Sequence, residues 1–150
     1  MTTTPTSAEA GTAWLVQCSV QPATVRALWK TSTLAPLRSD VWRVVEADLL
    51  RSVDAMRPLG RAGALGPVLV STERRRAWWL TALDAEDHLD DIPALTVRPA
   101  RWPLLCPEVG HSAYGRAWLE APDGTGKLTE PIALGAAFGP GSTLSAEAFR

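Results

Sequence analysis

Two apolar runs separated by a short polar and basic segment form the most regular pattern in the chain. The first run covers residues 65–70, and the second, residues 76–80, carries two adjacent tryptophans. Apolar runs of this length, joined by a polar segment and rich in β-branched and aromatic residues, are typical of a buried β-hairpin. We therefore predict a hairpin at residues 65–80 that forms the centre of the sheet.

Apolar residues repeated at three- and four-residue spacing predict five helices outside the hairpin. Their expected starts are residues 7–9, Pro22, Asp48, Asp84 and Pro131. Asp48 is the expected N-cap of the third helix, because its carboxylate can accept a hydrogen bond from a free backbone N–H. The expected apolar stripe of that helix consists of Leu49, Leu50, Val53 and Met56, and the helix ends at Pro58 and Gly60.

The other apolar segments predict short strands, at residues 41–45, 95–97, 102–106 and 116–120. The second and third lie near a sheet edge, because the prolines around them lack the N–H that a central strand needs. Helices and strands alternate irregularly, which predicts an α+β fold with a small mixed β-sheet packed by several short helices. We expect a flexible tail at residues 1–12, a single domain at 13–139 and a second tail at 140–150.

Composition narrows the possible functions. The chain has 150 residues, is 46% hydrophobic and carries a formal net charge of -1, so nucleic-acid binding would need a local basic patch. Cys18 and Cys106 are too few for a disulfide framework or a metal cluster, which favours a reduced, cytoplasmic setting. The N-terminus has no signal-peptide pattern, and no apolar run is long enough to span a membrane. Arginine greatly outnumbers lysine, which suggests GC-rich coding.

Three polar groups offer candidate chemistry, and each has a simpler structural interpretation. Residues 123–127 resemble a phosphate-binding loop but lack its first glycine and its metal-binding hydroxyl, so we favour a hairpin turn. The acidic residues between 84 and 91, with His88, could bind a cation, but a solvated helix face is favoured. Cys106 and His111 could be a nucleophile and a base, but no oxyanion motif is near them, so a buried inert thiol is favoured.

The basic segment of the hairpin is the strongest binding candidate. Arg74, Arg75 and Arg76 precede Trp78 and Trp79, and guanidiniums beside aromatic faces are what a platform for single-stranded nucleic acid uses. Adjacent residues on a strand point to opposite faces, so either both sides of the sheet are covered or one indole is displayed. The alternative is a solvated hairpin tip beside core tryptophans. Further arginines could extend a patch, namely Arg43, Arg98, Arg101 and Arg116.

Several segments together resemble the N-terminal domain of bifunctional DNA primase/polymerases, in particular its short stand-alone relatives. They are residues 40–42, 65–69, 76–80 and 116–124, and the match would extend over residues 13–139. The resemblance implies a primase/polymerase-like fold in which a strand places two carboxylates on divalent metal ions and a later strand supplies a histidine for the nucleotide phosphates.

The chain departs from that family pattern where catalysis depends on it. Asp40 matches the first carboxylate, but Trp42 and Arg43 stand where its acidic partner is expected. Residues 101–107, where the histidine is expected, contain none, and His111 is a distant substitute. The resemblance therefore implies a non-catalytic member that needs no cofactor, with magnesium or manganese expected only if Asp40 is active.

Three functional hypotheses follow. The first is a primase/polymerase-like protein without nucleotidyl transfer that binds nucleic acid or nucleotide through Arg74, Arg75 and Arg76. The second is a protein-interaction or self-association module that displays Trp78 or Trp79. The third, an active primase, predicts manganese-dependent primer synthesis that Asp40→Ala abolishes. The sequence gives no oligomeric state.

Overall fold

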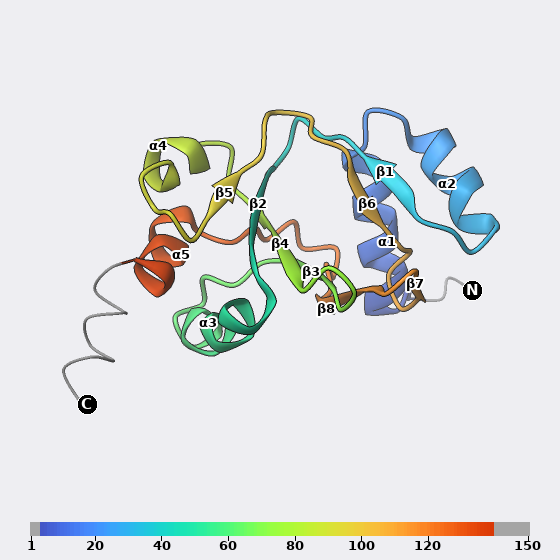
Figure 1. The fold of residues 1–150 in the computed structure, drawn as a ribbon. Helices are drawn as coiled ribbons and strands as arrows, with labels where there is room; N and C mark the ends of the chain where they lie inside the picture. The colour runs from blue at the N-terminus through green and yellow to red at the C-terminus, as the bar shows by residue number, and fades with distance from the viewer. Residues whose placement is uncertain (1–3, 140–150) are drawn as a thin grey trace.

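The computed structural model of this protein describes residues 4–139, and its centre is a six-stranded antiparallel sheet (Figure 1). In chain order the elements are α1 (Ser7–Cys18), α2 (Pro22–Lys30), β1 (Ala35–Leu37), β2 (Arg43–Asp48), α3 (Leu49–Arg61), β3 (Val68–Ser71), β4 (Arg76–Thr81), α4 (Ala85–Leu89), β5 (Thr96–Val97), β6 (Leu104–Cys106), β7 (Ser112–Ala113), β8 (Arg116–Glu120) and α5 (Pro131–Phe138). The predicted α+β fold is confirmed.

The β3–β4 hairpin lies at the centre of the sheet, as the sequence predicts. The strand order is β5-β2-β4-β3-β8-β7, and β1 pairs with β6 in a separate two-stranded sheet. All pairings between these strands are antiparallel, so the expectation of a mixed sheet is wrong. The proline-flanked strands β5 and β6 lie at the edge of one sheet and in the small second sheet, as expected.

Both faces of the six-stranded sheet are covered, so the two adjacent tryptophans are both buried. Trp78 packs in a core that α1, α2 and the β1–β6 pair complete, while Trp79 packs against α3, α4 and α5. The side chains of both residues are 0% exposed. The hypothesis that Trp78 or Trp79 is displayed is therefore wrong, because each indole is buried in a different core cluster.

Helix α3 presents a different face to the core from the one that its apolar residues predict. Asp48 caps the helix as expected, accepting a 3.0 Å hydrogen bond from the N–H of Arg51. The buried residues, however, are Ser52, Ala55 and Leu59, whereas Leu50 and Val53 of the predicted stripe are exposed. The buried indole N–H of Trp79 explains this orientation, because it donates to the hydroxyl of Ser52 at 3.1 Å.

The ordered part of the chain begins earlier than the expected tail at residues 1–12 allows. Helix α1 starts at Ser7, where the Thr6 side chain accepts a bond from the N–H of Glu9. Gly11 is buried against the backbone of Pro122, at a separation that leaves no room for a side chain. Residues 7–12 of the expected tail therefore belong to α1. The second expected tail, residues 140–150, lies outside the described residues.

Two strands form where the sequence predicts a connector or a loop. Residues 35–37 pair with β6 although they include Pro36. A proline is tolerated here because β1 has only one neighbouring strand and so needs few backbone N–H donors. Residues 112–113 pair with the start of β8 to form a short hairpin. Within residues 4–139, none of the helices combines the length and the apolar composition that a membrane span needs.

Candidate nucleic-acid interface

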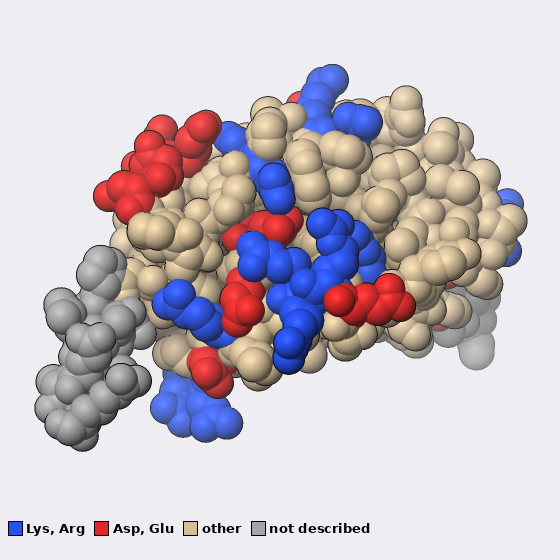
Figure 2. Space-filling model, in the orientation of Figure 1, with Lys and Arg blue, Asp and Glu red and all other residues tan. Residues whose placement is uncertain are grey.

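Four arginines and one carboxylate gather near the starts of β4 and β8. We call this group the arginine surface; it consists of Arg74, Arg76, Arg98, Arg116 and Glu46. Glu46 on β2 stands opposite Trp78 on β4, and Arg76 lies two residues before Trp78 on the same face. Figure 2 shows basic side chains concentrated in the middle of this face of the molecule, with acidic ones between and beside them.

Glu46 is the buried centre of the arginine surface. Its Oε1 accepts from the indole Nε1 of Trp78 at 2.7 Å and from Nη2 of Arg98 at 2.9 Å, and its Oε2 accepts from Nε of Arg76 at 3.0 Å. Burial opposes ionisation of this carboxyl, but the hydrogen bonds from Arg98, Trp78 and Arg76, with the positive charge of Arg98, outweigh burial and hold the pKa of Glu46 below its ordinary value. Glu46 is therefore a carboxylate that fixes two guanidiniums in place.

Arg116 is a buried guanidinium that forms no ion pair within the described part of the chain. Its residue is only 7% exposed, and its guanidinium carbon lies 4.4 Å from the ring centre of Trp78. Nη1 donates to the carbonyl of Leu105 at 2.8 Å, and no described carboxylate lies within ion-pair distance. Burial, together with the positive charge of Arg74, lowers the pKa of Arg116 from its ordinary value.

The tip of the β3–β4 hairpin extends the positive charge into solvent. Arg74 and Arg75 are exposed, and the N–H of Arg74 donates to the hydroxyl of Ser71 at 3.1 Å. Arg75 has a left-handed backbone with φ of 57°, and its carbonyl accepts from the N–H of Leu49. The backbone of the tip is therefore held at both ends, while its guanidiniums remain free to contact a ligand.

The tryptophans of the predicted platform cannot offer their faces to a base, because both are completely buried. The structure gives them other roles: Trp78 bonds Glu46 and lies under Arg116, and Trp79 bonds Ser52. The pairing of Glu46 with arginines was not predicted, although a single carboxylate within the apolar stretch of β2 is a signal, since buried acids are almost always paired.

Of the four arginines expected to extend the patch, two belong to it and two do not. Arg98 and Arg116 belong to the arginine surface. Arg43 donates to the carbonyl of Arg98 at 2.8 Å and pairs with Glu86 at 3.4 Å, so its guanidinium is already engaged. Arg101 forms two 2.7 Å hydrogen bonds with Asp40.

The carboxylates that a two-metal site would need do not meet. Asp40 is exposed and bound to Arg101, which lowers the pKa of Asp40 through its hydrogen bonds. Glu46 accepts hydrogen bonds from two arginines, and Asp48 caps α3. No group of three or more His, Cys, Asp or Glu side chains that could hold a metal ion occurs in residues 4–139. The residues present therefore do not fit a magnesium or manganese centre.

The other candidate groups keep their structural interpretations. Cys106 is fully buried, its thiol faces the carbonyl of Ala35, and burial raises its pKa far above the ordinary value. His111 is exposed and pairs with Glu108 at 3.6 Å. The acidic side chains of α4 are exposed, while Ala85 and Leu89 are buried, and His88 pairs with Asp84 at 3.1 Å. The expected burial of Cys106 and exposure of the acidic side chains of α4 are confirmed.

Residues 123–127 form a turn, but not the hairpin turn that we expected. The side chain of Asp123 accepts from the N–H and the hydroxyl of Thr125, which lowers the pKa of Asp123. The chain then leads towards α5 instead of pairing with β8, and Thr129 forms an isolated parallel bridge with Thr81. Gly124, with φ of 91°, packs against Ala10 of α1. The segment thus packs against α1.

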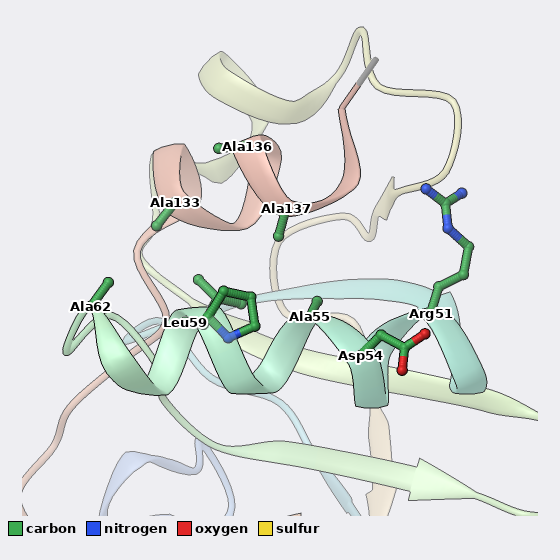
Figure 3. Close-up of a pocket in the computed structure, with 9 residues that line it drawn as sticks. Arg51, Asp54, Ala55, Leu59, Ala62, Ala133, Ala136 and Ala137 are labelled. Carbon is green, nitrogen blue, oxygen red and sulfur yellow. The ribbon is translucent and has the colours of Figure 1, made fainter. Parts of the chain in front are cut away.

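A separate groove of about 550 Å³ lies between α3 and α5 (Figure 3). Its walls are mainly small apolar side chains, including Ala55, Leu59, Ala133 and Ala137. Arg51 and Asp54 stand at one end, and Figure 3 shows both projecting from the start of α3. This lining offers an apolar contact with one charge of each sign, which is a poor match for a polyanion.

No family model, curated protein or solved structure matches this chain. The likeness to primase/polymerases therefore stays a prediction.

Proposed function

We propose that this protein is a primase/polymerase-like protein without nucleotidyl transfer, and that it binds nucleic acid through the arginine surface. The surface holds four guanidiniums against one buried carboxylate, and the exposed Arg75 adds a further charge at the hairpin tip. Guanidiniums match phosphate oxygens with paired N–H donors, so a phosphate backbone is the ligand that this chemistry favours.

The proposal rests mainly on the burial of Arg116 without an acidic partner in the described part of the chain. A buried guanidinium is ordinarily paired with an acid, but Arg116 forms no ion pair within residues 4–139. The positive charge of Arg74 acts on it more strongly than the negative charge of Glu46. Such an arrangement disfavours the free protein and is relieved when an anion binds between the two guanidiniums. Arg76 and Arg98, each held by Glu46, would present their remaining N–H groups to neighbouring phosphates at no further ordering cost.

The proposal is tested by measuring how a fluorescein-labelled single-stranded DNA binds at several salt concentrations, using anisotropy. Each phosphate contact on a single strand changes the slope of log K against log salt by roughly -0.7, so four contacts give a slope near -3. Arg74→Ala should weaken binding at low salt and make the slope shallower by about 0.7. Arg74 is exposed, so this variant should keep the fold.

Arg61→Ala is the matched control, because Arg61 is an exposed arginine at the end of α3, the helix that covers the opposite face of the sheet. It removes the same charge and should leave the slope unchanged. No salt-dependent binding by the wild-type protein at tens of micromolar would overturn the proposal. Equal losses in the two variants would show that only net charge matters.

A second candidate function is self-association, and the exposed face of α3 favours it. Leu50 and Val53 lie three residues apart, with exposed fractions of 66% and 46%, so they stand side by side on the helix. A second copy of the chain would cover them. Sedimentation should then show a concentration-dependent dimer that Leu50→Ser abolishes and Leu83→Ser, at another exposed leucine, does not; a monomer at all concentrations excludes this function.

A further inference from the structure

Tyr114 occupies a position in the fold that its size does not suit. It is the first of the two residues that join β7 to β8, since Ala113 pairs with Arg116. Its φ is 52° and that of Gly115 is 76°, which is a two-residue hairpin turn of type I′. Glycine, asparagine and aspartate adopt this conformation readily, whereas a bulky side chain is strained there.

Packing does not account for the tyrosine either, because Tyr114 is 71% exposed. An asparagine would fit the turn better, and an exposed ring contributes little to the core. Strain of this kind is often kept where a side chain has a function, and the inference runs from the observed conformation to that function. The neighbours of Tyr114 then indicate which function that is.

The turn that carries Tyr114 is hydrogen-bonded to the β3–β4 hairpin. The carbonyl of Gly115 accepts from the backbone N–H of Thr72 at 3.0 Å and from its hydroxyl at 3.4 Å. Arg116 follows the turn directly, and its charge is close enough to that of Arg74 to lower its pKa. The backbone that carries this exposed aromatic ring is thus held next to Thr72 of the β3–β4 hairpin and directly before Arg116.

We propose that Tyr114 stacks on an unpaired base of a single strand whose phosphates lie on the arginine surface. This inference rests on the proposed function and names its ligand class. An aromatic face stacks on any base, but only when the base is not already stacked within a duplex. The tyrosine takes over the role that the buried Trp78 and Trp79 cannot perform, and it makes the protein a binder of single strands.

The test compares three labelled probes with equal numbers of phosphates per strand: a thymidine 12-mer, an abasic 12-mer and a 12-base-pair duplex. Stacking on one base strengthens binding by about 5- to 100-fold, so the wild-type protein should prefer the thymidine strand to the abasic one by that factor. Tyr114→Asn removes the ring and suits the turn, so the variant should fold at least as well as the wild type.

Tyr114→Asn should lose about 5- to 100-fold in affinity for the thymidine strand and keep its affinity for the abasic one. Tyr114→Phe should bind like the wild type, because it retains the stacking face. Leu83→Asn serves as a control, since Leu83 is exposed but follows the far end of β4. It should change neither affinity.

The outcomes separate this inference from the proposed function. If the wild type binds none of the probes, the proposed function fails. If it binds the thymidine and abasic strands equally well and Tyr114→Asn changes nothing, the arginine surface stands and the role of Tyr114 is excluded. Duplex binding as tight as single-strand binding would also overturn the inference.

Discussion

The indole N–H of Trp78 donates a 2.7 Å hydrogen bond to the carboxylate of Glu46, which joins the core of the protein to its charged surface. The same carboxylate holds Arg76 and Arg98. A residue that the sequence presents as an interruption of an apolar strand thereby determines where two guanidiniums stand. The core and the proposed binding surface are coupled through one side chain.

Glu46→Gln tests that coupling. The amide can still accept from Trp78, but it loses the charge that pairs with Arg76 and Arg98, both of which remain part-exposed and can be hydrated. We expect the free energy of unfolding in urea to fall by about 1.5–3 kcal/mol, the range for hydrogen bonds to charged groups. Glu120→Gln, at an exposed glutamate, should change it by less than about 0.5 kcal/mol.

The pH dependence of stability should carry the signature of Glu46. Its pKa is depressed in the folded protein, so on acidification the unfolded state binds a proton first. The stabilisation is thus present above the ordinary glutamate pKa of about 4.3 and is lost as pH falls through the lower folded value. Denaturation curves between pH 7 and pH 3 should show a shallower acid loss for Glu46→Gln than for the wild type; parallel curves would contradict this.

Ser52→Ala should leave the indole N–H of Trp79 without an acceptor in a fully buried site. The expected loss of unfolding free energy is about 1–3 kcal/mol, the cost of an unsatisfied buried donor. Trp79→Phe also removes the bond, so in a double-mutant cycle the two losses should be less than additive. Additive losses would mean that the Ser52–Trp79 bond contributes nothing.

The orientation of α3 is tested by two leucines on the same helix. Leu59 is 2% exposed, so Leu59→Ala should reduce the unfolding free energy by about 2–5 kcal/mol. Leu50 is 66% exposed, and Leu50→Ala should change it by less than about 0.5 kcal/mol. The predicted apolar stripe requires Leu50 to be the sensitive position, so chemical denaturation of the two variants distinguishes the two helix orientations.

Two helical glycines should respond to alanine with opposite signs. A methyl group on Gly11 would collide with the carbonyl of Pro122, so Gly11→Ala should destabilise the protein by about 1–3 kcal/mol. At Gly60 the nearest atom is 3.8 Å from the added carbon, and Gly60→Ala should stabilise α3 by roughly 0.5–1 kcal/mol. Thermal melting measures both, and a stable Gly11→Ala protein would show that α1 does not pack as described.

Signals that act within a few residues were readable in the sequence. The β3–β4 hairpin, the Asp48 cap, and the helices that begin at Pro22 and Pro131 all form where local pattern places them. Each depends on side-chain alternation, an N-cap carboxylate or the preference of proline for the first helical turn. These features do not need knowledge of distant partners.

The rest of the fold and most of the candidate site depend on partners far along the chain. Glu46 meets Arg76 and Arg98 across 30 and 52 residues, and no local pattern marks that meeting. The rotation of α3 follows from Trp79, which lies 27 residues from Ser52. Tyr114 was missed because a single exposed tyrosine has no periodicity, and only the backbone reveals its strained position.

The early helices depend on segments that are synthesised much later. The indole N–H of Trp29 in α2 donates to the carbonyl of Cys106, 77 residues further on, and Gly11 of α1 packs on Pro122. A nascent chain that ends before β6 would therefore expose the apolar faces of both helices. The layer that α1 and α2 form can therefore finish packing only after almost the whole domain has been synthesised.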